Sequence, residues 1–101
     1  MAKKSSVEKN KRRQKIVNAK WEKRQEIKKR SLDLSLTEDE RQLARIALNK
    51  MPRDSSIIRV RNRCALTGRS RGFLRKFKIS RLTFREMANM GMIPGVTKSS
   101  W

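Results

Sequence analysis

The sequence predicts a mainly α-helical protein with irregular extended segments. Its parts are a long basic helix near the amino terminus, a short middle helix, and a small carboxyl-terminal module made of a loop and a helix. Three observations lead to this prediction. Gly and Pro are absent between Lys3 and Arg30, a helix-capping pattern occurs at Thr37 and Glu40, and turn-forming residues become frequent after Pro52.

The first predicted helix spans about Lys3 to Arg30. Lys, Arg, Glu and Gln dominate this stretch, and all four are good helix formers. Its apolar residues form no continuous stripe, so the helix has no face for a core and is marginal by itself. Phosphates bound on several sides would stabilise it. We assign residues 1–35 to a basic helical extension.

The middle helix is expected at about residues 38–50. Thr37 and Glu40 have the spacing of a capping box, acidic residues fill the first turn, and Pro52 ends the helix. Because apolar residues follow at helical spacing, we expect this amphipathic segment, residues 36–51, to pack by its apolar face in the ordinary way. The apolar residues are Leu43, Ile46, Ala47 and Met51.

Residues 52–101 form the third predicted part, a compact Arg-rich module followed by a tail. Asp and Ser residues after Pro52 indicate a turn. The segment Ile57–Arg63 partly alternates apolar and basic residues, which indicates an extended stretch with a cationic edge. Two glycines make Thr67–Gly72 a loop.

A last helix is expected from about Arg81 to Met90. Ser80 is a suitable amino-terminal cap and Gly91 a suitable stop. The tail beyond it ends in Trp101, where an aromatic side chain either frays with the chain end or inserts into a partner's groove or against a base.

Charge indicates the kind of partner. The chain has 28 basic and 9 acidic residues and a net charge of +19. Residues 1–30 and 52–101 each have a net charge of +10, whereas residues 31–51 have −1. Such self-repulsion calls for a polyanion, and nucleic acid is the usual one. With 36% apolar residues there is little to bury, so we expect a small packed part with extensions that order on the partner.

Several classes of protein are disfavoured. The chain has no His, and we find no acid–base pair, no nucleophile–base arrangement and no phosphate-cradling loop, so we expect neither an enzyme nor a cofactor. The single cysteine excludes an intramolecular disulfide. No apolar run suits a signal peptide or a membrane span, which predicts a soluble intracellular protein without a membrane partner.

The basic residues of the carboxyl-terminal module are candidate RNA contacts. Only Asp54 and Glu86 lie among them, too few to neutralise them, and Arg suits bidentate phosphate contacts. Three interleaved phenylalanines, Phe73, Phe77 and Phe84, form a small core in the favoured interpretation and stack on bases in the other. We expect RNA contacts from Arg53, Arg59, Arg61, Arg63, Arg69, Arg71, Arg75, Lys76, Lys78, Arg81, Arg85, Lys98 and Trp101, and, in the first helix, from Lys11, Arg12, Arg13, Lys20 and Arg24.

One spacing resembles that of a structural metal site. Cys64 and Thr67 are separated by two residues, and twelve residues later Ser80 and Thr83 are again separated by two, which is the rhythm of paired zinc cysteines. Hydroxyls are poor zinc ligands, so no metal is expected. The module would be a zinc ribbon or knuckle without its metal, or Ser80 and Thr83 merely start a helix.

The carboxyl-terminal half resembles small-subunit ribosomal protein number fourteen in its bacterial long form. The chain start, the basic helix and the total length agree with this resemblance. The matching pieces are Pro52-Arg53-Asp54-Ser55-Ser56, Arg61-Asn62-Arg63-Cys64, Thr67-Gly68-Arg69, Arg71-Gly72-Phe73, Arg75-Lys76-Phe77, Ser80-Arg81, Arg85-Glu86, Ile93-Pro94-Gly95 and Lys98-Ser99-Ser100-Trp101.

The resemblance implies a structural constituent of the small ribosomal subunit. Members of the family bind small-subunit rRNA in the head of the particle near the aminoacyl-tRNA (A) site and are needed for assembly. They lie beside small-subunit proteins three and ten, with nineteen close. One version of the family holds zinc with four cysteines, and Thr67, Ser80 and Thr83 stand where three of these would be, which implies the zinc-less version. Cys64 is then a small buried apolar side chain.

Location and assembly state follow in part. We expect a protein of the bacterial cytoplasm, within the ribosome, with an organelle matrix less favoured because the amino terminus does not look like a transit peptide. No homo-oligomer is expected. The alternative function is an architectural DNA-binding protein, although the sequence has no clear dimeric core or groove-fitting element. A membrane-active helix would need an apolar face that residues 3–30 lack.

Overall fold

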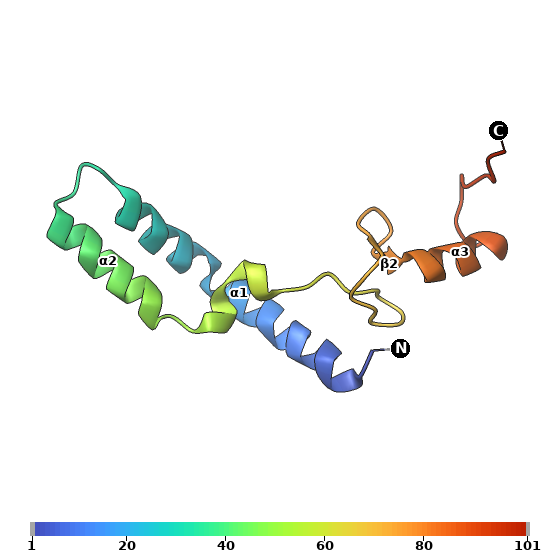
Figure 1. The fold of residues 1–101 in the computed structure, drawn as a ribbon, viewed down its shortest axis with the longest axis horizontal. Coiled ribbons are helices and arrows are strands. Elements are labelled where there is room, and N and C mark those ends of the chain that lie inside the picture. The colour runs from blue at the N-terminus through green and yellow to red at the C-terminus, as the bar shows by residue number, and fades with distance from the viewer. Residues whose placement is uncertain (1, 101) are drawn as a thin grey trace. The chain divides into compact units, whose positions relative to one another are not determined.

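The computed structural model describes residues 2–100 and is mainly helical, which confirms the predicted class (Figure 1). Two compact units are found among these residues. We call Glu8–Val60 the hairpin unit, and residues 2–7 with 61–100 the terminal unit. The elements, in order, are α1 (Lys4–Leu32), α2 (Glu38–Lys50), the 3-10 turns η1 (Arg53–Ser55) and η2 (Ile57–Arg59), β1 (Phe73–Leu74), β2 (Ile79–Ser80) and α3 (Arg81–Asn89).

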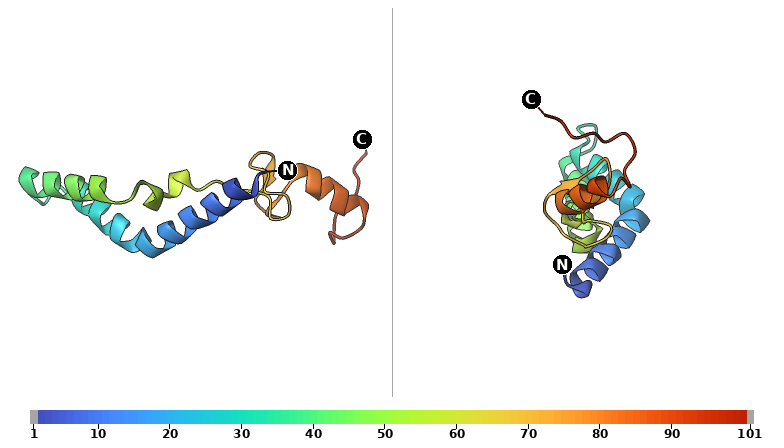
Figure 2. Two further views of the ribbon diagram at one scale, coloured as in Figure 1. Left: turned by 90° about the horizontal axis from the view of Figure 1, so that it is seen from below. Right: turned by 90° about the vertical axis from the view of Figure 1, so that its right-hand side faces the viewer.

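In the hairpin unit, α2 runs back alongside the second half of α1 (Figures 1 and 2). Both predicted helices are confirmed, and α2 has the predicted bounds. The hydroxyl of Thr37 accepts a hydrogen bond from the backbone N–H of Glu40 at 3.3 Å, as a capping residue should. Within residues 2–100, no helix combines the length and the apolar character needed to cross a membrane.

The hairpin unit buries few apolar side chains. Val17 of α1 is 1% exposed and Ala44 of α2 is 6% exposed. The prediction that α2 packs by its apolar face is wrong for Leu43 and Ile46, which are 67% and 42% exposed. The physical reason is that a two-helix hairpin has no third element to cover the remaining face of α2.

The segment after α2 differs from the sequence prediction in one part. The predicted turn after Pro52 is present as η1. However, Ile57–Arg59 form a second 3-10 turn, η2, so the extended stretch predicted for Ile57–Arg63 is wrong in its first half. Alternation over so few residues does not distinguish a strand from a helical turn.

The terminal unit is organised around a very short antiparallel hairpin. Phe73 pairs with Ser80 and Leu74 with Ile79, and Lys78 adopts a left-handed conformation with φ of 57° in the connecting turn. Strand β2 then leads directly into α3. The hydroxyl of Ser80 accepts a hydrogen bond from the backbone N–H of Thr83 at 3.3 Å, which confirms Ser80 as the cap of this helix.

The phenylalanines of the terminal unit contribute to a small, partly open core. The rings of Phe77 and Phe84 lie with their centroids 4.9 Å apart at an angle of 40°. Both rings, and that of Phe73, are half-buried. The buried apolar side chains here are Cys64 and Ile79. A core of this size leaves much of the unit's stability to polar interactions.

The first described residues close against the loop at Gly68. The backbone N–H of Ala2 donates to the carbonyl of Thr67 at 3.4 Å. Gly68 has φ of 77°, and a Cβ placed there would lie 2.7 Å from Cγ2 of Val7. Only glycine satisfies both the left-handed conformation and this close approach. Segments far apart in the sequence therefore form one unit.

Candidate nucleic-acid interface

The four positions with zinc-like spacing come together around Cys64. Its sulfur lies 3.6 Å from the Thr83 hydroxyl, and the residue is 3% exposed. The Ser80 hydroxyl donates to the Thr83 hydroxyl at 3.1 Å. Thr67 contacts the same sulfur through its side chain and its backbone. The hairpin places Ser80 beside the loop that contains Cys64 and Thr67.

Hydrogen bonds in this cluster favour the ionised form of Cys64. Because Ser80 donates to Thr83, the Thr83 hydroxyl is free to donate to the sulfur. Burial would raise the pKa of the Cys64 thiol, but hydrogen bonds from Thr67, from the backbone of Ser80 and from Thr83 lower it to about 5. Cys64 is buried as predicted, yet its surroundings are polar and not apolar.

The cluster does not have the donors of a zinc site. It offers one sulfur and three hydroxyl oxygens, and a neutral hydroxyl is a poor ligand for zinc. Within residues 2–100, no group of three or more His, Cys, Asp or Glu side chains is placed to hold a metal ion. Hydrogen bonds among these side chains hold the loop together.

Three of the predicted RNA-contacting arginines are engaged inside the hairpin unit. Arg59 lies 2.9 Å and Arg13 lies 3.4 Å from the same carboxylate oxygen of Asp54. Arg24 donates to the hydroxyl of Ser55 at 2.9 Å, and Ser55 is fully buried. These bonds fix the 3-10 turns onto α1. Polar contacts of charged groups are among the stronger ones in proteins, and these three are only partly exposed to solvent.

Three further arginines stabilise the loop of the terminal unit by donating to backbone carbonyls. Arg63 donates to Gly68 at 2.9 Å, Arg61 donates to Ser70 at 3.0 Å, and Arg69 donates to Arg71 at 3.2 Å. Each guanidinium has five N–H donors, and each of these bonds uses one of them.

A second group of cations is exposed. Within residues 2–100, no hydrogen bond or ion pair engages the side chains of this group. Lys76 stands apart, since its ammonium lies 5.6 Å from the centre of the Phe77 ring. The exposed group is Arg53, Arg71, Arg75, Lys78, Arg81, Arg85 and Lys98.

Some of these exposed cations surround a groove along α3. The groove has a volume of about 520 Å³, with Phe84, Ala88 and Val96 among its apolar lining residues. Arg81, Arg85 and Lys98 contribute to the same lining. A groove lined by both apolar and cationic side chains suits a nucleotide, because a base can stack on the apolar side chains while its phosphates meet the cations.

The basic residues predicted on the first helix have varied environments. Lys11 pairs with Glu8 at 3.5 Å, and Arg12 is exposed. Lys20 lies in a shallow groove between α1 and the end of α2, together with Lys23 and Lys50. The predicted contact through Trp101 lies outside the described residues.

Sequence reasoning missed the hydroxyl partners of these cations and of Cys64. Ser55 lies 31 residues from Arg24, so no local pattern links them. The family-like segment Pro52–Ser56 was the available signal, since it marks Ser55 but not its partner. For Thr67 and Thr83 the signal was the spacing, although the direction of their hydrogen bonds needed the structure.

Comparison with known proteins identifies the family of this chain. A family model described as "Ribosomal protein S14p/S29e" matches residues 47–100. A "Small ribosomal subunit protein uS14" of Protochlamydia amoebophila is 71% identical over 101 residues, which is all of both chains. Proteins of the same name from Chlamydia trachomatis serovar D and Chlamydia felis are 58% and 56% identical over the same full length. The chain therefore belongs to the ribosomal protein S14 family and is not an enzyme.

Proposed function

We propose that this protein is a structural constituent of the small ribosomal subunit that binds small-subunit rRNA. The observation that carries the proposal is that Arg81, Arg85 and Lys98, which line the groove along α3, are exposed and their side chains form no bond within residues 2–100. Cations left exposed at this density repel one another until phosphates neutralise them. The relatives named as proteins of the small subunit support the same conclusion.

The finer assignment rests on the resemblance. Residues 52–101 act as an Arg-rich rRNA-binding module of zinc-ribbon or knuckle type without metal, residues 1–35 as a basic extension, and residues 36–51 as the short helix between them. The module binds in the head of the subunit, shapes rRNA near the A site and is needed for assembly. Proteins three and ten are its neighbours, nineteen lies close, and the particle is cytoplasmic and of bacterial type.

Reconstitution with the full chain tests this function. The protein is added to small-subunit rRNA with the other subunit proteins, and the particles are separated by sedimentation. We expect the protein to sediment with the particle and to protect rRNA of the head from chemical modification. Equal affinity for duplex DNA and for folded rRNA would instead favour an architectural DNA-binding protein.

A further inference from the structure

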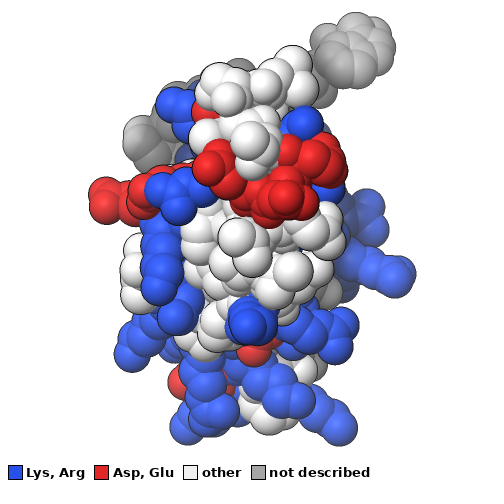
Figure 3. Space-filling model, turned by 90° about the vertical axis from the view of Figure 1, so that its left-hand side faces the viewer, with Lys and Arg blue, Asp and Glu red and all other residues white. Residues whose placement is uncertain are grey.

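Glu86 of α3 is the one acidic residue of the terminal unit. The other carboxylates of the chain belong to the hairpin unit, and Figure 3, which faces the end of that unit, shows acidic side chains gathered there. The side chain of Glu86 is exposed and forms no hydrogen bond or ion pair within residues 2–100. A carboxylate repels phosphate, so Glu86 suits a ligand group of another kind.

Glu86 lines a pocket of about 410 Å³ between α3 and the loop that precedes the short hairpin. Thr67, Arg69 and Ser70 are lining residues from the loop. Leu82 is a lining residue from α3 and lies one turn before Glu86, on the same side of the helix. The pocket therefore combines a carboxylate, a guanidinium and hydroxyls with an apolar side chain.

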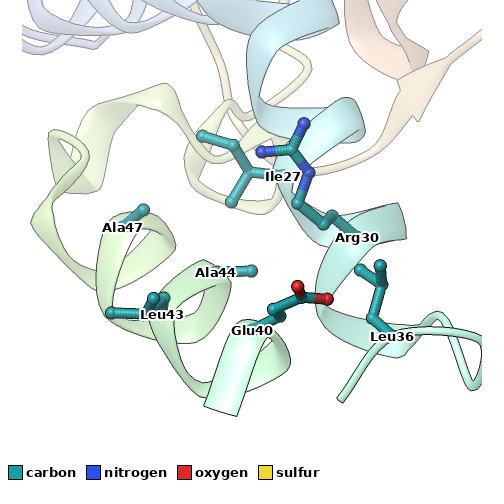
Figure 4. Close-up of a pocket in the computed structure, with 7 residues that line it drawn as sticks. All are labelled: Ile27, Arg30, Leu36, Glu40, Leu43, Ala44 and Ala47. Carbon is teal, nitrogen blue, oxygen red and sulfur yellow. The ribbon is translucent and has the colours of Figure 1, made fainter. Parts of the chain in front are cut away.

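The two opposite charges of this pocket do not pair with each other. Arg69 donates from Nε to a backbone carbonyl of its own loop at 3.2 Å, and no ion pair joins it to Glu86. The groove between α1 and α2 also has one residue of each charge, Arg30 and Glu40 (Figure 4). There, however, the guanidinium pairs with Glu26 at 3.8 Å. A ligand that contacts both Arg69 and Glu86 must offer an acceptor to the first and donors to the second.

Among the bases of RNA, guanine meets this requirement most directly. Its N1–H and N2–H groups lie side by side and can both donate to one carboxylate, and the adjacent O6 accepts from a cation. Adenine and cytosine have no second N–H group beside their amino group on this edge. The edge is accessible in an unpaired nucleotide. Leu82 is 48% exposed and offers an apolar surface to the face of the base.

The pocket adjoins the groove along α3, because Leu82 lines both. Arg81 and Arg85 line that groove and are exposed. A base in the pocket would therefore bring the neighbouring phosphates of its strand close to these cations. Phosphate contacts supply affinity and orientation, whereas contacts with a base edge supply specificity.

We propose that this pocket, which we call the Glu86 pocket, binds an unpaired guanine of small-subunit rRNA. Glu86 accepts hydrogen bonds from N1–H and N2–H of the base, and Arg69 donates to its O6, so Glu86 determines specificity. The proposal rests on the proposed function, since it names the base that one site of an rRNA-binding protein recognises. If Glu86 only diluted the positive charge, removing its charge would strengthen RNA binding. Recognition of guanine predicts the opposite sign.

Glu86→Gln in the full chain tests the proposal, because the amide keeps the size of the side chain but sets an N–H donor against the donors of guanine. We expect rRNA binding to weaken about ten-fold, as for the loss of one bidentate base contact. Glu22→Gln is the matched control, since Glu22 of α1 is also exposed and forms no ion pair within residues 2–100. It removes the same charge and should leave binding unchanged or slightly stronger. Unchanged or stronger binding by Glu86→Gln would overturn the proposal.

Chemical modification of the bound rRNA identifies the base. Kethoxal reacts with N1 and N2 of unpaired guanines, so the wild-type chain should protect a guanine that becomes reactive when the bound chain is Glu86→Gln. Replacing that guanine by inosine, which lacks the N2 amino group, should weaken binding of the wild-type chain but not of Glu86→Gln. If no guanine changes its reactivity between the two chains, or if inosine weakens both chains equally, the Glu86 pocket does not bind guanine.

The proposed function has a separate readout. If rRNA binding itself is wrong, the wild-type chain fails to sediment with the particle and protects no part of the rRNA. If the guanine proposal alone is wrong, sedimentation and protection persist, and Glu86→Gln binds rRNA as Glu22→Gln does.

Discussion

In the hairpin unit Arg24 and Arg59 bond to Ser55 and Asp54, whereas in the terminal unit Arg81 and Arg85 are exposed and bond to no described side chain. Arg24 and Arg59 hold the 3-10 turns against α1. Arg81 and Arg85 are exposed to a ligand from outside the chain. In the sequence the four arginines look alike. The difference teaches that a cation's role depends on whether an oxygen acceptor from its own chain lies within reach.

The two units also differ in how they are held. Arginine bonds to a buried serine and an aspartate fix the hairpin unit. In the terminal unit, the hydroxyls of Ser80 and Thr83 meet around the thiol of Cys64. Because the four positions with zinc-like spacing lie close together, replacing the three hydroxyls by thiols should turn the cluster around Cys64 into a metal site.

The largest expected effect comes from that restoration, with Thr67→Cys, Ser80→Cys and Thr83→Cys in one chain. Two sulfurs bonded at about 2.3 Å to a tetrahedral zinc lie about 3.8 Å apart. In the wild-type chain the sulfur of Cys64 lies at a similar distance, 3.6 Å, from the hydroxyl oxygen of Thr83. We expect tight zinc binding, worth about 10 kcal/mol or more, with release of protons. Cobalt titration should show tetrahedral thiolate bands. The wild-type chain is the control, and tight binding by it would contradict our interpretation of the cluster.

The next effect separates the two groups of arginines. Arg81→Ala with Arg85→Ala should weaken rRNA binding roughly ten-fold per residue, because each removes a charged hydrogen bond to phosphate. Each phosphate interaction removed in this way should lower the slope of the salt dependence by about one unit. Arg13→Ala with Arg24→Ala removes equal charge but mainly internal bonds, so its salt dependence should change less. The measurement is rRNA binding across a range of salt concentrations. Equal slopes for the two double variants would show that the two groups of arginines do not differ in their contacts with phosphate.

The same assay ranks arginine against lysine. Lys11→Ala and Lys20→Ala, on the first helix, should each cost less affinity than Arg81→Ala. The guanidinium offers a fixed fork of donors to phosphate, whereas the ammonium acts as a point charge. Equal losses from the two residue types would refute this ranking.

A smaller effect concerns the buried serine. Ser55→Ala leaves the Arg24 guanidinium without its acceptor and should destabilise the hairpin unit by about 1–3 kcal/mol. Hydrogen exchange of the amides around Pro52 within assembled particles measures this. Ser56→Ala is the control, because the hydroxyl of Ser56 does not cap the 3-10 turn that follows it. Unchanged exchange after Ser55→Ala would show that Arg24 does not fix the turns.

A last effect is a pH dependence of the terminal unit. The pKa of Cys64 falls from an ordinary value of 9.0 to about 5. The folded unit therefore favours the thiolate, and this contribution to stability is fully present above pH 9.0 and lost as pH falls through about 5. Thiolate absorbance should titrate near pH 5 in the particle-bound chain. Cys64→Ser should abolish this dependence, and a midpoint at the ordinary thiol value in the wild type would refute it.

Local signals predicted part of this structure well. The bounds of α2 follow from the Thr37 cap and Pro52, which act within a few residues of each helix end. The exposure of Leu43 could not be predicted, since the same apolar spacing fits a buried face or an unpartnered one. The strands β1 and β2 have two residues each, too few for any periodicity to show.

The candidate site was predictable in kind but not in detail. Charge indicated a polyanion partner, and the zinc-like spacing singled out positions 64, 67, 80 and 83, which the structure brings together around the sulfur of Cys64. Arg24 bonds within its own chain and Arg81 does not. This difference depends on Ser55, which lies 31 residues from Arg24 in the sequence. Long-range pairing of this kind leaves no mark on local composition.

The close approach of Gly68 and Val7 has a consequence for the order of events during synthesis. The first residues of the chain have no site to pack against until the ribosome has added Gly68. At about 5–20 residues per second, that delay lasts several seconds. During this time the emerging basic helix is free to meet nucleic acid before its own loop exists. The residues near the amino terminus are therefore synthesised early but can pack only after the loop at Gly68 has been made.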